Sequence, residues 1–88
     1  MKYTVNYTEK ALKSLKKLDR SVLFMIKAWI EKNLLETENP RQHGKGLTAT
    51  RSGQWRYRVG DYRILAEIQE DKLVILVVEV GHRKNIYE

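Results

Sequence analysis

The sequence contains no cysteine, one proline and one phenylalanine among its 88 residues. The absence of cysteine excludes a disulfide scaffold, a thiolate metal site and a cysteine nucleophile. No apolar run in the sequence is long enough to cross a bilayer. Residues 1–5 run into a strand-like alternation and do not resemble a signal peptide. We therefore expect a soluble, cytoplasmic protein that does not bind membranes.

Acidic residues are also few. The chain has 17 Lys and Arg against 11 Asp and Glu, which gives a net charge of +6. Such an excess indicates polyanionic partners, namely RNA, DNA, anionic lipid or an acidic protein. A chain of this length forms a single domain, residues 1–88, with a thin core. Any active site must therefore be shallow and lie on the face or rim of one sheet.

Hydrophobic periodicity changes along the chain. Residues 2–7 alternate with period two, which predicts a strand with one buried face. Thr8 is a candidate N-cap for a helix over 9–18, whose buried stripe would comprise Ala11, Leu12, Leu15 and Leu18. A second helix is predicted from Asp19 or Ser21 to about residue 35, and a loop over 36–54.

The second half of the chain reads as strands. Period-two or continuous apolar patterns predict three of them, at 54–59, 62–69 and 73–80, followed by a tail at 82–88. The order is thus β-α-α-β-β-β. It predicts an α+β, two-layer domain in which an antiparallel sheet is packed on one side by an N-terminal helical hairpin.

Arginine is concentrated between residues 51 and 63. This span has a single acidic residue and four arginines, Arg51, Arg56, Arg58 and Arg63. A two-residue hairpin turn at 60–61 would place Arg58 opposite Arg63, with Arg56 on the same sheet face. Like charges directly opposite one another destabilise a sheet. We therefore interpret the arginines as a phosphate site, since guanidinium groups bind phosphate through two parallel hydrogen bonds.

A solvated surface is the alternative explanation for these charges. The arginines would then point into water or pair with Glu67 or Glu79. The first 35 residues hold eight basic and three acidic residues. The lysines of the predicted helices serve either a polyanion-binding face or solubility.

The tail adds His82, Arg83, Lys84 and Tyr87 directly after the last strand. His82 is a candidate general acid or base near neutral pH, and the alternative is a merely exposed side chain. The ring of Tyr87 suits stacking on a base or closing the edge of the core.

Two C-terminal segments carry a family resemblance. Residues 55–64 (WRYRVGDYRI) and 78–87 (VEVGHRKNIY) closely resemble the RelE branch of the RelE/ParE toxin superfamily. Residues 7–11 (YTEKA) and 15–18 (LKKL) are similar to the opening of that family. The resemblance implies a small cytoplasmic toxin of a toxin–antitoxin pair, without metal or other cofactor, that cuts mRNA in the ribosomal A site.

The resemblance also implies roles for individual residues. Arg63 matches the arginine that stabilises the scissile phosphate, Arg83 the one that contacts phosphate or protonates the leaving group, and Tyr87 the stacking tyrosine. Arg56 and Arg58 stand where well-studied members carry two lysines, one of them proposed as the base. Because arginine stays protonated, we expect Arg58 to polarise or position the 2′-OH. The base would then be His82 or Glu79.

These considerations give a set of candidate site residues. We predict catalytic roles for Arg58, Arg63, His82, Arg83 and Tyr87. We predict binding of RNA phosphates by Arg51, Arg56 and Lys84. The expected partners are a RelB-like antitoxin, the ribosome and mRNA, and operator DNA only through the toxin–antitoxin complex.

Two other functions remain open from the sequence. The ParE-like branch shares the fold and poisons DNA gyrase without catalysis. A basic module that binds RNA or DNA without cutting is also consistent with the charge. Fold alone does not separate these possibilities.

Overall fold

Strands and helices follow the predicted order in the computed structural model, which describes residues 1–46, 54–82 and 84. The strands are β1 (Thr4–Tyr7), β2 (Lys45–Gly46), β3 (Gln54–Val59), β4 (Tyr62–Gln69) and β5 (Val74–His82). The helices are α1 (Glu9–Lys16) and α2 (Arg20–Asn33). The short strand β2 lies within the predicted loop, and β5 continues past the predicted end at residue 80. No helix in these ranges is long and apolar enough to cross a membrane.

The five strands form one sheet in the order β1-β5-β4-β3-β2. The pairs β2–β3, β3–β4 and β4–β5 are antiparallel, as predicted. Strand β1 instead pairs in parallel with β5, with Thr4 opposite Val74. The sheet is therefore mixed, which corrects the prediction of an antiparallel sheet. Residues 70 positions apart form this pair, so no local turn in the sequence indicates its direction.

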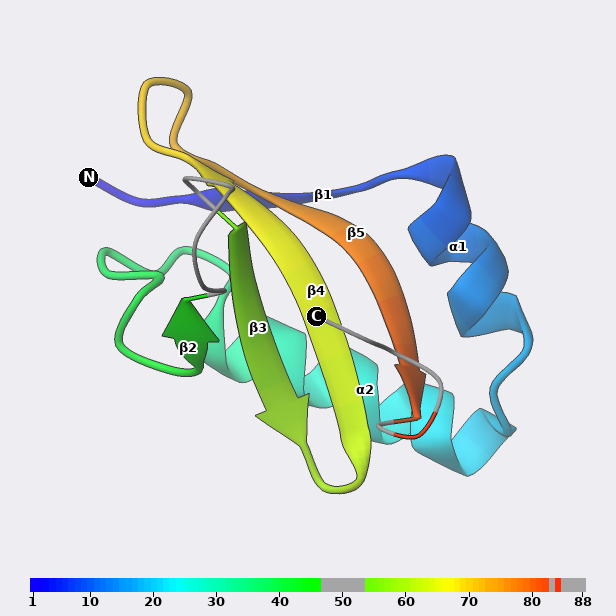
Figure 1. Cartoon of the computed structure of the whole chain (residues 1–88). Coiled ribbons are helices and arrows are strands. Elements are labelled where there is room, and N and C mark those ends of the chain that lie inside the picture. The colour runs from blue at the N-terminus through cyan, green and yellow to red at the C-terminus, as the bar shows by residue number, and fades with distance from the viewer. Residues whose placement is uncertain (47–53, 83, 85–88) are drawn as a thin grey trace.

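Both helices follow β1, as Figure 1 shows. Helix α2 crosses behind the sheet, and α1 lies beside β5. Ile26 and Ile30 of α2, and Leu34 at its C-cap, are buried in one core with the sheet residues Tyr57 and Ile64. The prediction that Leu12 belongs to the buried stripe of α1 is wrong, since Leu12 is 47% exposed, whereas Ala11 and Leu15 are buried as predicted.

Thr8 connects α1 to the edge of β5. Its hydroxyl accepts a hydrogen bond from the Ala11 N–H at 3.0 Å, which confirms the predicted N-cap. The same hydroxyl donates to the Val78 carbonyl oxygen at 3.0 Å. A single side chain thus starts the helix and fixes it against the sheet.

The register of β4 and β5 shifts next to Val78. Ala66 pairs with Val77, but the preceding Leu65 pairs with Glu79, so β5 carries one extra residue. Such a bulge reverses the faces to which the following side chains point. Val80 is therefore buried on the helix side, whereas Glu79 and Gly81 belong to the opposite face.

Candidate nucleic-acid interface

Four cations lie on the face of the sheet that points away from α2. Strand β3 alternates between the buried Tyr57 and Val59 and the outward Arg56 and Arg58. Arg58 pairs across the turn with Arg63 of β4, as predicted. Lys45 of β2 pairs with Arg56 on the other side. We call Lys45, Arg56, Arg58 and Arg63 the arginine face.

The arginine face surrounds a shallow hollow of about 280 Å³ that Gly44 also lines. Gly44 adopts a positive φ of 80°, and a Cβ at this position would lie 2.2 Å from the Arg56 carbonyl oxygen. Only glycine fits such a close approach of two backbones. This approach brings Lys45 beside the arginines. Sequence reasoning missed Lys45; its one signal was the pattern Gly-Lys-Gly at 44–46.

Two aromatic side chains of β3, the buried Tyr57 and the partly buried Trp55, hold the segment before Gly44. The Tyr57 hydroxyl donates to the Pro40 carbonyl oxygen at 2.6 Å, and the Trp55 indole N–H donates to the His43 carbonyl oxygen at 2.6 Å. Burial raises the pKa of Tyr57 well above its usual value, against a smaller opposite effect of Arg41. Side chains on the inner face of β3 thus hold the segment that leads to Gly44 and Lys45, and these two residues line the hollow on the outer face.

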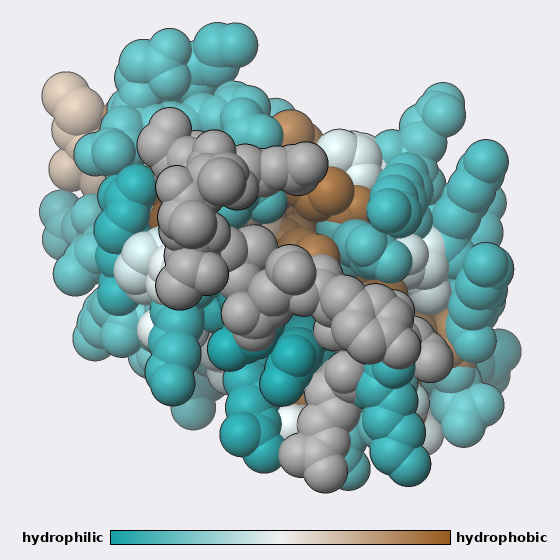
Figure 2. Space-filling model, in the orientation of Figure 1, coloured by the Kyte–Doolittle hydropathy of each residue, from teal (hydrophilic) through white to brown (hydrophobic). Residues whose placement is uncertain are grey.

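The cations of the arginine face repel one another. The pKa of Arg56 is lowered from its usual value, first by burial and then by the charges of Arg63 and Arg58. The group still carries its proton at neutral pH, because an arginine is protonated at any ordinary pH. A bound phosphate would relieve both the repulsion and the cost of burial. Figure 2 shows that this side of the molecule is largely hydrophilic.

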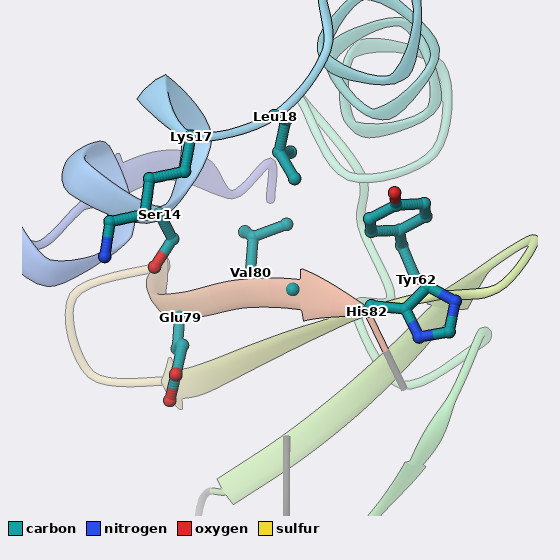
Figure 3. Close-up of a pocket in the computed structure, with 8 residues that line it drawn as sticks. Ser14, Lys17, Leu18, Tyr62, Glu79, Val80 and His82 are labelled. Carbon is teal, nitrogen blue, oxygen red and sulfur yellow. The ribbon is translucent and has the colours of Figure 1, made fainter. Parts of the chain in front are cut away.

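His82 does not join the arginine face. It pairs with Tyr62 at the end of β4, and the two rings meet edge to face with centroids 5.4 Å apart. Arg63 points outward, so its neighbour on β4, Tyr62, points to the helix side of the sheet. His82 pairs with Tyr62, so both rings lie on that side. They line a second hollow of about 350 Å³ with Lys17, Leu18 and Val80 (Figure 3).

The two carboxylates considered as arginine partners have other contacts. Glu79 forms an ion pair with Lys10 of α1 at 3.3 Å. Glu67 accepts a hydrogen bond from the Gln69 amide at 3.3 Å. Glu79 pairs with Leu65, which is two residues from Arg63 on β4. Glu79 is therefore on the same sheet face as Arg63. It therefore remains a candidate base.

Three of the predicted site residues, Arg51, Arg83 and Tyr87, lie outside the described residues. Lys84 is exposed, and its N–H donates to the Nδ1 atom of His82 at 3.2 Å. Nothing in the described ranges gathers three His, Asp or Glu side chains that could hold a metal ion. The structure thus brings together Arg56, Arg58 and Arg63, adds Lys45, and separates His82 from them.

A match to a protein family extends over nearly the whole chain. Residues 5–87 match the family described as the ParE toxin of the type II toxin–antitoxin system parDE. The chain belongs to this toxin family. The match includes both helices, the arginine face and all of the sheet except Thr4.

Relatives place the toxin with the RelE-like members of the RelE/ParE superfamily. It is 31% identical over 87 residues to the toxin RelG of Mycobacterium tuberculosis, covering 99% of this chain and 98% of RelG. The toxin–antitoxin complex RelBE2 of M. tuberculosis contains a similar chain, with a TM-score of 0.83 and 28% identity over 97% of this chain and 95% of that one. The isolated RelE toxin of Escherichia coli gives a TM-score of 0.74 at 26% identity, covering 91% and 83%. The predicted fold class and family are confirmed.

Proposed function

We propose that this toxin is a metal-independent endoribonuclease that cleaves mRNA in the ribosomal A site. The observation that carries the proposal is the convergence of Arg56, Arg58, Arg63 and Lys45 around one hollow. The family membership and the similarity to RelE toxins support it. A site made of guanidinium groups suits a reaction whose transition state carries negative charge on a phosphate.

The proposed reaction uses the RNA as its own nucleophile. The 2′-oxygen loses its proton to a base and attacks the neighbouring phosphorus. The bond from phosphorus to the 5′-oxygen breaks, which leaves a 2′,3′-cyclic phosphate, and the 5′-oxygen takes up a proton from an acid. In this scheme Arg63 stabilises the scissile phosphate, Arg58 polarises the 2′-OH, and Arg56 and Lys45 bind neighbouring phosphates.

Residues that follow β5 complete the proposed site. Arg83 contacts the phosphate or protonates the leaving oxygen, and Tyr87 stacks near the cleaved nucleotide. Lys84, and Arg51 before β3, bind further phosphates along the strand. The roles of Arg83 and Tyr87 rest on the resemblance of residues 78–87 to the RelE branch, and those of Lys84 and Arg51 rest on their positive charge.

The shape of the site supports dependence on the ribosome. A shallow hollow of about 280 Å³ contacts few groups of an RNA strand. Cleavage requires the 2′-oxygen, the phosphorus and the 5′-oxygen in line, and holding reactants in such an arrangement accounts for a large part of catalysis. We infer that the ribosome holds the codon in line while the toxin supplies the charges.

A RelB-like antitoxin is the proposed cellular partner. An apolar groove between the helices is lined by Tyr7, Leu12, Leu15 and Leu23, with Lys16 and Lys27 at its rim. Phe24, which follows Leu23 on α2, is 76% exposed. An acidic amphipathic helix matches this combination of apolar floor and basic rim. The RelBE2 structure is itself a toxin–antitoxin complex. Binding to operator DNA would occur only through such a complex, in the cytoplasm.

Inhibition of DNA gyrase is the second candidate function. The name of the matching family, ParE toxin, favours it. A gyrase inhibitor does not need a phosphate-binding hollow on its sheet, so the arginine face favours the ribonuclease.

Primer extension on a defined mRNA tests the proposal. The purified toxin is added to a translating extract and, separately, to the same mRNA without ribosomes. We expect new 5′ ends at in-frame codon positions only where ribosomes are present. An intact message together with stabilised gyrase–DNA breaks in a parallel assay would contradict the ribonuclease and support the second candidate. A binding module would leave both substrates intact and bind RNA with a steep dependence on salt.

A further inference from the structure

The four cations of the arginine face form two cross-strand pairs. Lys45 of β2 lies directly opposite Arg56 of β3. Arg58 of β3 lies directly opposite Arg63 of β4. Residues directly opposite one another have Cβ atoms about 4.5–5.5 Å apart. Each pair therefore brings two positive charges together, and an anion bound between them would relieve the repulsion.

The two pairs are displaced from each other on the sheet. Arg56 and Arg58 are two residues apart on β3, so the pairs are offset by about 7 Å along the strand. One pair joins β2 to β3 and the other joins β3 to β4, which adds an offset of about 5 Å across the sheet. An RNA strand carries one phosphate per nucleotide. Two displaced cation pairs thus suit two successive phosphates of one strand.

The segment that carries Lys45 lies tightly against Trp55 of β3. A Cβ on Gly44 would approach the indole nitrogen of Trp55 to 2.8 Å, and a Cβ on Gly46 would lie 3.1 Å from the indole ring. The indole N–H also donates a hydrogen bond to the carbonyl oxygen of His43 at 2.6 Å. Residues on both sides of Lys45 therefore contact one side chain, which fixes the backbone of Lys45 beside Arg56.

We propose that Lys45 and Arg56 form a second phosphate subsite, for the RNA linkage next to the cleaved one, and that Trp55 is the positioning residue that holds Lys45 there. The scissile phosphate then lies at Arg58 and Arg63. This inference rests on the proposed ribonuclease function and deepens it, because the toxin holds two successive phosphates of the message. A phosphate contact carries no sequence information, so the subsite sets the register of the strand and not the codon preference.

Three variants test the subsite. Lys45→Met removes the ammonium group and keeps an unbranched stem. Trp55→Phe keeps an aromatic ring but loses the indole N–H. Lys72→Met is the matched control, because Lys72 is exposed in the turn that follows β4, at the end of that strand away from Arg63.

Cleavage is measured on programmed ribosomes in single turnover, with the toxin concentration varied. The mRNA is either intact or carries one uncharged methylphosphonate, placed at the linkage before or after the cleaved one. The concentration for half-maximal cleavage reports binding, and the rate at saturating toxin reports the chemical step.

On intact mRNA, Lys45→Met should raise the half-maximal concentration about tenfold, the effect of a lost charged hydrogen bond. The rate at saturation should stay within about threefold of wild type. One of the two methylphosphonates should weaken the wild type by a similar factor and Lys45→Met no further. A tenfold effect of Lys45→Met that persists with both methylphosphonates would overturn the subsite and assign Lys45 to another anion. Binding by Lys45→Met equal to that by Lys72→Met would also overturn it.

Trp55→Phe tests the positioning role. It should raise the half-maximal concentration about threefold, and Trp55→Phe combined with Lys45→Met should be no weaker than Lys45→Met alone, because Trp55 acts through Lys45. Losses that add in the double variant, or a fall in the rate at saturation, would contradict the positioning role.

A short 2′-O-methyl RNA tests the subsite independently of cleavage, because it has no free 2′-OH to react. At low salt it should shift the amide resonances of Lys45 and Gly46 in nuclear magnetic resonance spectra, and Lys45→Met should bind it about tenfold more weakly. A wild type that cuts mRNA, while Lys45→Met binds this RNA as tightly as wild type, would refute the subsite alone. A wild type that binds this RNA as expected but cuts no mRNA would refute the ribonuclease function, and with it the place of the subsite next to a cleaved bond.

Discussion

The two faces of the sheet differ in what they are made of, although they alternate along the same strands. On β4, Ile64 is fully buried against α2, while its neighbour Arg63 points outward beside Arg58. The buried face gains stability from apolar packing. The arginine face places two like charges directly opposite each other, which opposes folding. Stability and the proposed activity are thus carried by neighbouring residues on opposite faces of the sheet.

The core face should be the more sensitive to truncation. Ile64→Ala removes a fully buried side chain and leaves a cavity, so we expect a loss of about 2–5 kcal/mol in the free energy of unfolding. Denaturation by urea measures it. Cleavage per folded molecule should stay unchanged, and a large loss there would show that the two faces are not separable.

A smaller loss is expected where the core supports the rim of the hollow. Tyr57→Phe leaves the Pro40 carbonyl oxygen without its buried donor, which should cost about 1–3 kcal/mol. Folding raises the pKa of Tyr57, so as the pH rises its hydroxyl loses the proton in the unfolded chain before it does so in the folded protein. The contribution of Tyr57 to the free energy of unfolding is therefore fully present below about pH 10 and decreases at higher pH. Thermal unfolding between pH 7 and 11 should show a weaker alkaline decrease in Tyr57→Phe, and an unchanged decrease would contradict this reasoning.

The ion pair between α1 and β5 should matter less. Lys10→Met removes a surface contact with Glu79, in which the Lys10 side chain is 67% exposed. We expect a loss of about 0.2–1 kcal/mol that disappears at high salt. A urea titration at two salt concentrations would measure it, and a salt-independent loss would indicate packing of the lysine stem instead.

The smallest effect on stability is expected on the arginine face itself. Arg58→Thr removes the like-charge pair with Arg63 and keeps a good strand former. It also removes the Nε hydrogen bond to the Gly60 carbonyl oxygen at 3.2 Å. The free energy of unfolding should therefore change by less than about 0.5 kcal/mol, while cleavage falls about tenfold or more. Lower stability with full activity would assign Arg58 to the fold.

Local patterns predicted much of this site. The two-residue turn at 60–61 fixed the register of β3 and β4, and with it the pairing of Arg58 with Arg63. Thr8 was identified as a helix cap because capping depends on residues three positions apart. These features follow from neighbours in the chain.

Features that depend on distant pairing were not predictable in this way. The parallel pairing of β1 with β5 joins opposite ends of the sequence. The extra residue near Val78 reverses the side of the sheet to which His82 points, and no turn residue marks it. Lys45 reaches the arginines only because Gly44 approaches the backbone of Arg56. The roles of Arg51, Arg83 and Tyr87 stay predictions.

The most direct test compares two arginines that differ in location. Arg63→Ala and Arg20→Ala, the latter exposed at the start of α2, are assayed by primer extension in a translating extract after confirming equal thermal unfolding. We expect Arg63→Ala to lose the ribosome-dependent 5′ ends by about 10²-fold or more, and Arg20→Ala to keep them. Full cleavage by Arg63→Ala would contradict the account, because the arginine face would then not carry the activity.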